Sequence, residues 1–249
     1  MSPHDSNPVQ RPSLALLGAE PFRAAFELAR NHMARRKPTA PGNGHPVVIF
    51  PGLGADASSV ATLRDHCRSL GYEAFDWGQG LNIGPQGDLD SWLHALKGRV
   101  TELLAAYEQP ATLIGWSLGG LYAREVGKLM AAPRVQQVIT MGTPFNAQAD
   151  HTNAGWLFRL LSGNSSVVDA ALSKRLRTPP PVRTTSIYSR SDGVVAWQTC
   201  LHDKRSTLVH DIEVESSHIG MGWNRQVLDV VTDRLGQAGG PWRRYVQGS

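Results

Sequence analysis

The sequence predicts an α/β fold in which a mostly parallel, twisted sheet carries helices on both faces. Short apolar runs typical of buried strands alternate along the chain with segments whose apolar residues recur every three or four positions. Parallel strands need helical crossovers of this kind, so the alternation indicates βαβ units. The chain has 249 residues, of which 41% are hydrophobic and 18% charged, and these values fit one large globular domain.

The first 45 residues form an extension in this prediction. The segment Ala19–Arg36 has helical apolar spacing, and the stretch KPTAPGNGHP then breaks the chain. We therefore expect an N-terminal extension with one helix over residues 1–45, packed on its own domain, and a main domain over 46–249. The apolar positions that predict the helix are Phe22, Phe26, Ala29 and Met33.

Six strands and four helices are expected in the main domain. The strands are the apolar runs PVVIF, YEAFDW, ATLIG, RVQQVITMG and TTSIYS, followed by HDIEVES, whose alternation indicates one solvated face. The helices are SSVATLRDHCRSLG, the long amphipathic segment from Leu89 to Tyr107, LGGLYAREVGKLM and NRQVLDVVTDRL.

One insertion interrupts the alternation of strands and helices. Residues 144–181 have helical apolar spacing but contain no convincing strand. A structureless loop of this length is uncommon in a compact domain, so we expect a small helical cap over one end of the sheet.

The pentapeptide Gly-Trp-Ser-Leu-Gly marks a candidate nucleophile, Ser117. A serine on a tight strand-to-helix turn needs small neighbours, and here an apolar strand precedes the motif and an amphipathic helix follows it. A serine hydroxyl is a weak nucleophile near neutral pH, so it needs an imidazole to accept its proton and a carboxylate to orient that imidazole. The alternative is a structural serine in a glycine-rich turn.

Two downstream loops supply candidates for the base and the acid. His218 follows the last expected strand, whereas His202 lies in a connecting segment and His210 begins a strand. Asp192 follows the penultimate expected strand, and its alternative role is that of a turn-forming Asp-Gly pair. Because the carboxyl ends of parallel strands meet at one edge of the sheet, we expect both side chains to lie beside Ser117.

Charge that develops on a substrate carbonyl oxygen needs fixed hydrogen-bond donors. Leu118, directly after the candidate nucleophile, can offer its backbone N–H at a helix N-terminus. The loop after the first strand of the main domain can offer a second donor from Leu53, with Gly52 and Gly54 allowing its backbone to come close. A simple glycine turn is the alternative for this loop.

Five segments, PGLG, GWSLGG, MGTPF, SRSDGVV and SSHIGM, together resemble a known family in sequence and in order. Over residues 46–236 the chain resembles α/β-hydrolase fold enzymes of the esterase and lipase type, and MGTPF is similar to the segment that leads into the lid of lipase-like members. The family pattern after the first of these strands usually begins His-Gly, where this chain has Pro51-Gly52. The resemblance implies a nucleophile, acid, base and two oxyanion donors at Ser117, Asp192, His218, Leu53 and Leu118.

The sequence thus predicts a serine hydrolase that cleaves carboxylic esters by an acyl-enzyme mechanism, acting on a small-molecule ester with an apolar acyl group. A thioesterase or acyltransferase shares the acyl-enzyme and is the alternative, and a non-catalytic binding module could have the same fold. Four aromatic side chains either line the acyl pocket or pack in the core: Trp116, Phe145, Trp156 and Phe158.

Other chemistries and partners are not indicated. The chain has no Cys-x-x-Cys pair, His-Glu-x-x-His helix or Walker loop, so we expect no metal site and no cofactor. The net charge of +4 is spread along the chain, which argues against nucleic-acid binding. Two cysteines are too few for a disulfide framework and are expected to be reduced.

The distribution of apolar residues bears on location. No stretch of about 18 consecutive apolar residues occurs, so no stable membrane insertion is expected. No secretory signal is evident at the N-terminus, and a cytoplasmic protein is the expectation.

Overall fold

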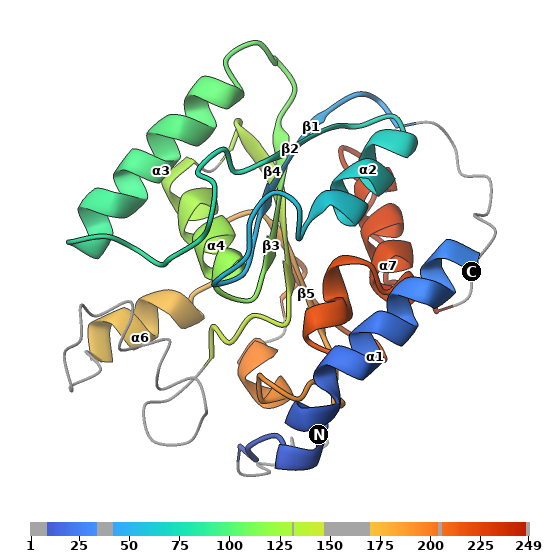
Figure 1. Ribbon diagram of the computed structural model, residues 1–249. Helices are drawn as coiled ribbons and strands as arrows, with labels where there is room; N and C mark the ends of the chain where they lie inside the picture. Colours follow the sequence, from blue (N-terminus) through green and yellow to red (C-terminus); the bar gives the residue numbers. More distant parts are fainter. Residues whose placement is uncertain (1–8, 34–41, 131, 147–169, 204–205, 248–249) are drawn as a thin grey trace.

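A six-stranded sheet runs through the middle of the molecule (Figure 1). The computed structural model describes residues 9–33, 42–130, 132–146, 170–203 and 206–247. The strand order is β2-β1-β3-β4-β5-β6, and all five pairings are parallel. The strands are β1 (Pro46–Phe50), β2 (Glu73–Asp76), β3 (Ala111–Trp116), β4 (Val135–Met141), β5 (Arg183–Tyr188) and β6 (Val209–Glu213).

Helices cover both faces of the sheet, as the alternating pattern predicts. Figure 1 shows α3 (Leu89–Leu103), α4 (Leu118–Met130) and α6 (Ala170–Arg177) on one side and α1 (Leu14–Met33), α2 (Ala61–Ser69) and α7 (Arg225–Gly236) on the other. Two short 3₁₀ helices, η1 (Trp197–Cys200) and η2 (Ile219–Gly222), lie in the connections after β5 and β6. The α/β fold class is confirmed.

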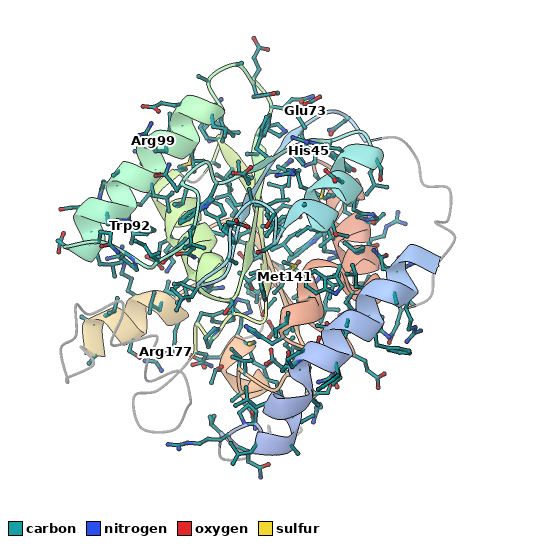
Figure 2. The ribbon with its side chains drawn as sticks, viewed as in Figure 1. His45, Glu73, Trp92, Arg99, Met141 and Arg177 are labelled. Carbon is teal, nitrogen blue, oxygen red and sulfur yellow. The ribbon has the colours of Figure 1, made fainter. Side chains whose placement is uncertain are left out.

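The sheet divides the hydrophobic core into two layers because successive side chains of a strand point to opposite faces. Val48 and Leu113 pack with α3 and α4 on one face, whereas Val47 and Ile114 pack with α2 and α7 on the other. The central strands are buried on both faces, which is why their sequences are continuously apolar. Figure 2 shows Met141, the last residue of β4, in the interior of the molecule, where it is fully buried in the layer that includes α2 and α7.

The order in which the chain adds strands to the sheet reverses at β1, although all strands run parallel. The chain passes from β1 outward to β2 and then returns to β3 on the other side of β1. The loops that follow β1 and β3 therefore diverge at the carboxyl edge of the sheet, and such a switch point is where open α/β sheets form their ligand sites. Both Leu53 and Ser117 lie in this position, directly after β1 and β3.

The N-terminal helix is present but its orientation differs from what its apolar spacing suggests. It begins at Leu14, five positions before the expected start, and ends at Met33. Phe22 and Phe26 are 79% and 63% exposed, while Glu20 and Ala24 are buried. Polar contacts to two loops, described below, hold the inward face, so apolar periodicity finds this helix but identifies the wrong face as buried.

Of the segment 144–181, where a helical cap is expected, the structure describes residues 144–146 and 170–181. This described part contains α6. The guanidinium of Arg124 on α4 donates hydrogen bonds to three main-chain oxygens at the C-terminal end of α6, those of Leu176, Arg177 and Thr178, at 3.3, 3.2 and 3.3 Å. Trp156 and Phe158 lie outside the described residues.

Two further expectations concern cysteines and membrane spans. Cys67 and Cys200 are buried free thiols, as expected. Burial raises the pKa of the Cys67 thiol to about 12, which keeps it protonated and unreactive. In the part of the chain that the structure describes, no helix has the length and apolar character to cross a membrane.

Candidate active site

Ser117 occupies the tight turn between β3 and α4. Its φ of 53° lies in the left-handed region, and no other non-glycine residue of the described chain has a positive φ. This conformation costs about 1–2 kcal/mol for an L-residue, so neighbouring contacts must fix it. The Ser117 N–H donates to the Met141 main-chain oxygen at 2.8 Å, and the Gly120 N–H donates to the Ser117 main-chain oxygen at 3.0 Å.

The glycines of the motif are explained by close backbone approach. A Cβ on Gly119 would collide with the main-chain oxygens of Phe50 and Pro51, and one on Gly120 would collide with the side chain of Thr143. Helix α4 can therefore begin directly after Ser117 only because these positions lack side chains. The GWSLGG segment thus forms the strand–turn–helix that its spacing predicts.

His218 and Asp192 form a buried hydrogen-bonded pair. His218 Nδ1 donates to Asp192 Oδ2 at 2.7 Å, and both side chains are almost fully enclosed. The second carboxylate oxygen, Oδ1, accepts from the backbone N–H groups of Val194 at 2.8 Å and Val195 at 2.7 Å. These donors fix the orientation of the carboxylate, so it is suited to orient an imidazole.

The environment of His218 favours its protonated form. Burial lowers the pKa of the imidazole, but the charge of Asp192, the hydrogen bond from the ring to Asp192 and the charge of Glu20 together outweigh it, and the net effect is a raised pKa. A base with a raised pKa accepts a proton more readily at neutral pH, which is the property that a serine nucleophile requires of its partner.

The backbone of Met141 and Gly142 brings the serine and the His–Asp pair together. Met141 accepts the Ser117 N–H, and the next residue, Gly142, lies against the pair. A Cβ on Gly142 would lie 3.0 Å from His218 Nδ1 and 3.2 Å from Asp192 Oδ2. In the described residues Ser117 Oγ donates no hydrogen bond, and in unliganded sites the bond from nucleophile to base is often formed only when substrate binds.

The candidate oxyanion donors lie on either side of the switch point. The Gly52 backbone passes close to Ser117, since a Cβ on Gly52 would lie 3.4 Å from Ser117 Cβ. Leu53 is 39% exposed, and no acceptor for its N–H is found among the described residues. Leu118 is the first residue of α4, where backbone N–H groups lack intrahelical partners. Their donor roles stay predictions.

Two of the four aromatic candidates can be placed. The Trp116 indole N–H donates to the His218 main-chain oxygen at 3.0 Å, and its ring centroid lies 5.9 Å from that of His218. Phe145 is buried under Arg124, whose guanidinium carbon is 3.8 Å from the ring centroid. Trp116 therefore supports the loop that carries His218 and Phe145 packs in the core, while contact of either with substrate stays a prediction.

The usual metal ligands are dispersed in the described part of the chain. No group of three or more His, Cys, Asp or Glu side chains in the described part of the chain is arranged to hold a metal ion.

The residues near the His218–Asp192 pair that sequence analysis missed are Gly142 and Glu20. Gly142 lies within the segment MGTPF, whereas no pattern around Glu20 indicates that its carboxylate accepts hydrogen bonds from the N–H groups of Gly193 and Ile219, 173 and 199 positions later in the chain.

Comparison with known proteins identifies the family. The model of the alpha/beta hydrolase family matches residues 47–246. The chain belongs to this family. No curated protein matches.

Solved structures support the fold of this alpha/beta hydrolase. A structure described with the metagenome-derived lipolytic enzymes LipS and LipT has a TM-score of 0.59 at 12% identity, covering 80% of this chain and 96% of its own. Aspergillus fumigatus lipase B gives 0.61 at 16% identity, with coverage of 82% and 56%. The mature Bacillus licheniformis lipase gives 0.57 at 18% identity, with coverage of 81% and 94%.

We predict that Gly142→Ala slows labelling of this hydrolase by a fluorophosphonate about tenfold or more, because the φ of 54° disfavours alanine and the new methyl group crowds the His–Asp pair. The measurement is the labelling rate of folded protein. Gly98→Ala is the matched control, since a Cβ on Gly98 in α3 meets nothing within 4 Å. Equal labelling rates for both variants would contradict the tight fit at Gly142.

Proposed function

We propose that this alpha/beta hydrolase cleaves carboxylic esters through an acyl-enzyme formed on Ser117. One observation carries the proposal: a buried His218–Asp192 pair, bonded at 2.7 Å, flanks the same Met141–Gly142 backbone that holds the strained turn of Ser117. A purely structural serine needs no such pair, whereas a nucleophilic serine needs both a proton acceptor and a group that orients it.

The proposed first half-reaction forms the acyl-enzyme. Because His218 Nδ1 is engaged by Asp192, Nε2 is the ring nitrogen available to accept the Ser117 proton. Ser117 Oγ attacks the ester carbonyl as His218 takes this proton, and the imidazolium is stabilised by the Asp192 carboxylate. The N–H groups of Leu53 and Leu118 stabilise the negative carbonyl oxygen, and His218 then delivers its proton to the leaving alcohol.

The second half-reaction repeats these roles with water. His218 removes a proton from water, the resulting nucleophile attacks the acyl carbonyl, and the same donors stabilise the oxyanion. Collapse of this intermediate returns the proton to Ser117 Oγ and releases the carboxylic acid. The position of Ser117 at the topological switch point, between the loops after β1 and β3, supports binding of a small molecule at this edge.

Ester substrates are favoured by the structural neighbours, which include lipolytic enzymes and lipases. At such low identity they support the fold, and the choice of an apolar acyl group remains part of the proposal. Partition of the acyl group to an added alcohol or thiol, measured against water, separates an esterase from an acyltransferase.

Ser117→Ala should abolish turnover of chromogenic esters, since no other hydroxyl occupies the turn after β3. A panel of esters and thioesters graded by acyl length provides the measurement, and Ser91→Ala on the exposed start of α3 provides the control. A Ser117→Ala enzyme that keeps more than about a thousandth of the wild-type rate would rule out Ser117 as nucleophile, because loss of a nucleophile costs more than this.

The pH dependence follows from the raised pKa of His218. Only the neutral imidazole can accept the serine proton, so kcat/KM is expected to fall as pH drops through a midpoint above the ordinary histidine value. In Asp192→Asn the negative charge that raises this pKa is gone, so the midpoint moves to lower pH while the maximal rate falls. The check is a pH–rate profile with two different esters; a midpoint below the ordinary value in wild type would contradict the assignment.

A further inference from the structure

Helix α1 presents an acidic face to the active-site loops. Glu20, Ala24 and Glu27 are spaced by four and three positions, which places them on one side of a helix. Figure 1 shows α1 lying across the face of the molecule that also carries η2 and α7. Its outward side carries Phe22 and Phe26, so burial of large apolar side chains does not account for its attachment. Polar contacts must supply much of it.

The carboxylate of Glu20 joins the two catalytic loops. Oε1 accepts a hydrogen bond from the backbone N–H of Gly193 at 2.8 Å, and Oε2 accepts one from the N–H of Ile219 at 3.0 Å. Gly193 directly follows Asp192 and Ile219 directly follows His218. Glu20 is only 1% exposed. One side chain therefore holds the neighbours of both members of the His–Asp pair.

Three further contacts attach α1 to the same loops. Glu27 Oε1 accepts from the N–H of Ser217, the residue before His218, at 2.7 Å. The Trp223 indole N–H donates to the main-chain oxygen of Ala24 at 2.9 Å. Arg23 Nη2 donates to Ser191 Oγ, just before Asp192, at 2.8 Å. The helix thus contacts the chain on both sides of each catalytic side chain.

Close packing leaves little freedom between the helix and the loops. A Cβ on Gly193 would lie 2.6 Å from the main-chain carbon of Leu16, and a Cβ on Gly220 would collide with the Glu27 carboxylate. Each loop therefore has a glycine where α1 passes. A carboxylate buried to this degree is costly unless it is paired, and its two backbone donors with Arg23, 3.7 Å from Oε1, supply that pairing.

We propose that Glu20 is a positioning residue of the active site, which fixes the separation and orientation of Asp192 and His218 by bridging their loops. The expected effect of Glu20 on turnover rests on the proposed function. It has an electrostatic part as well, because the negative charge of Glu20 contributes to the raised pKa of His218. Only a carboxylate can accept hydrogen bonds from the backbone N–H groups of both Gly193 and Ile219, because both of its oxygens are acceptors. The side chain of glutamine offers one oxygen acceptor and one NH₂ donor group instead.

The charged groups around His218 are few. Asp192 comes from the loop after β5, and Glu20, Arg23 and Glu27 come from α1. The groups that approach His218 from β3, after β4 and from η2 are uncharged: Trp116, Gly142 and Met221. A change in the titration of His218 on substitution of Glu20 can therefore be assigned to that carboxylate.

The test compares Glu20→Gln with wild type by two independent readouts. The first is the NMR titration of the His218 imidazole, assigned by its loss in His218→Gln, which requires no substrate. We expect the pKa of His218 to fall, since the removed negative charge stabilises the imidazolium. The second is ester turnover, where kcat falls about tenfold and KM is unchanged, because Glu20 positions catalytic groups rather than binding substrate.

Two controls separate positioning from general stability. Glu27→Gln removes a charge from the same face of α1 and is expected to leave the titration of His218 nearly unchanged. Phe22→Ala, at a 79% exposed position of the same helix, is expected to leave both readouts at wild-type values. Thermal unfolding of each variant shows how much of any loss in turnover comes from unfolded protein.

Glu20→Asp covers the case in which Glu20→Gln does not fold. It keeps the charge but is too short to reach both amides, so we expect kcat to fall while the pKa of His218 stays raised. Wild-type kcat in folded Glu20→Asp, or an unshifted His218 titration together with wild-type kcat in folded Glu20→Gln, would overturn the proposal. Absence of ester turnover in the wild type contradicts the proposed function alone, because the titration is measured without substrate.

Discussion

The left-handed backbone of Ser117 is the constraint on which the rest of the site depends. A φ of 53° turns the chain sharply from β3 into α4 and leaves the serine at the edge of the sheet rather than within it. The turn exists because glycines let α4 lie against the backbone after β1 and against Thr143. The loop that contains Gly52 also lies close to Ser117, so the turn lies beside one of the candidate oxyanion loops.

The His218–Asp192 pair is held from two sides of the molecule. From the sheet, Trp116 bonds to the main-chain oxygen of His218, and Gly142 leaves room for the imidazole and the carboxylate. From outside the sheet, Glu20 and Glu27 on α1 bond to the backbone on either side of His218. Preorganised groups of this kind need no rearrangement as charge develops, which is how such sites lower a barrier.

Much of the fold could be predicted because its signals are local. Buried parallel strands are continuously apolar, and the serine motif needs glycines at fixed offsets, so β3, Ser117 and α4 follow from a short segment. Asp192 and His218 could be chosen because the carboxyl ends of parallel strands share an edge. The structure brings this pair together, while their roles in catalysis remain our proposal.

The contacts of α1 could not be predicted from the sequence. Periodicity treats apolar residues as the buried face, but Phe22 and Phe26 are exposed and Glu20 is buried. The hydrogen-bond partners of Glu20 are backbone N–H groups, which every residue except proline carries. No side-chain pattern therefore marks Gly193 or Ile219 as a partner of Glu20. Polar burial of this kind depends on tertiary geometry that a local pattern does not contain.

The central claim, that Ser117 forms a covalent acyl-enzyme, is tested most directly by rapid acid quenching of the wild-type enzyme during turnover of a chromogenic ester. Peptide mass spectrometry then locates the acyl group. The account predicts a mass increment equal to the acyl group on the peptide that contains Ser117, formed in a burst with the first equivalent of released alcohol. Turnover of the ester with the acyl group on another residue, or with no acylated peptide and no burst, would contradict it.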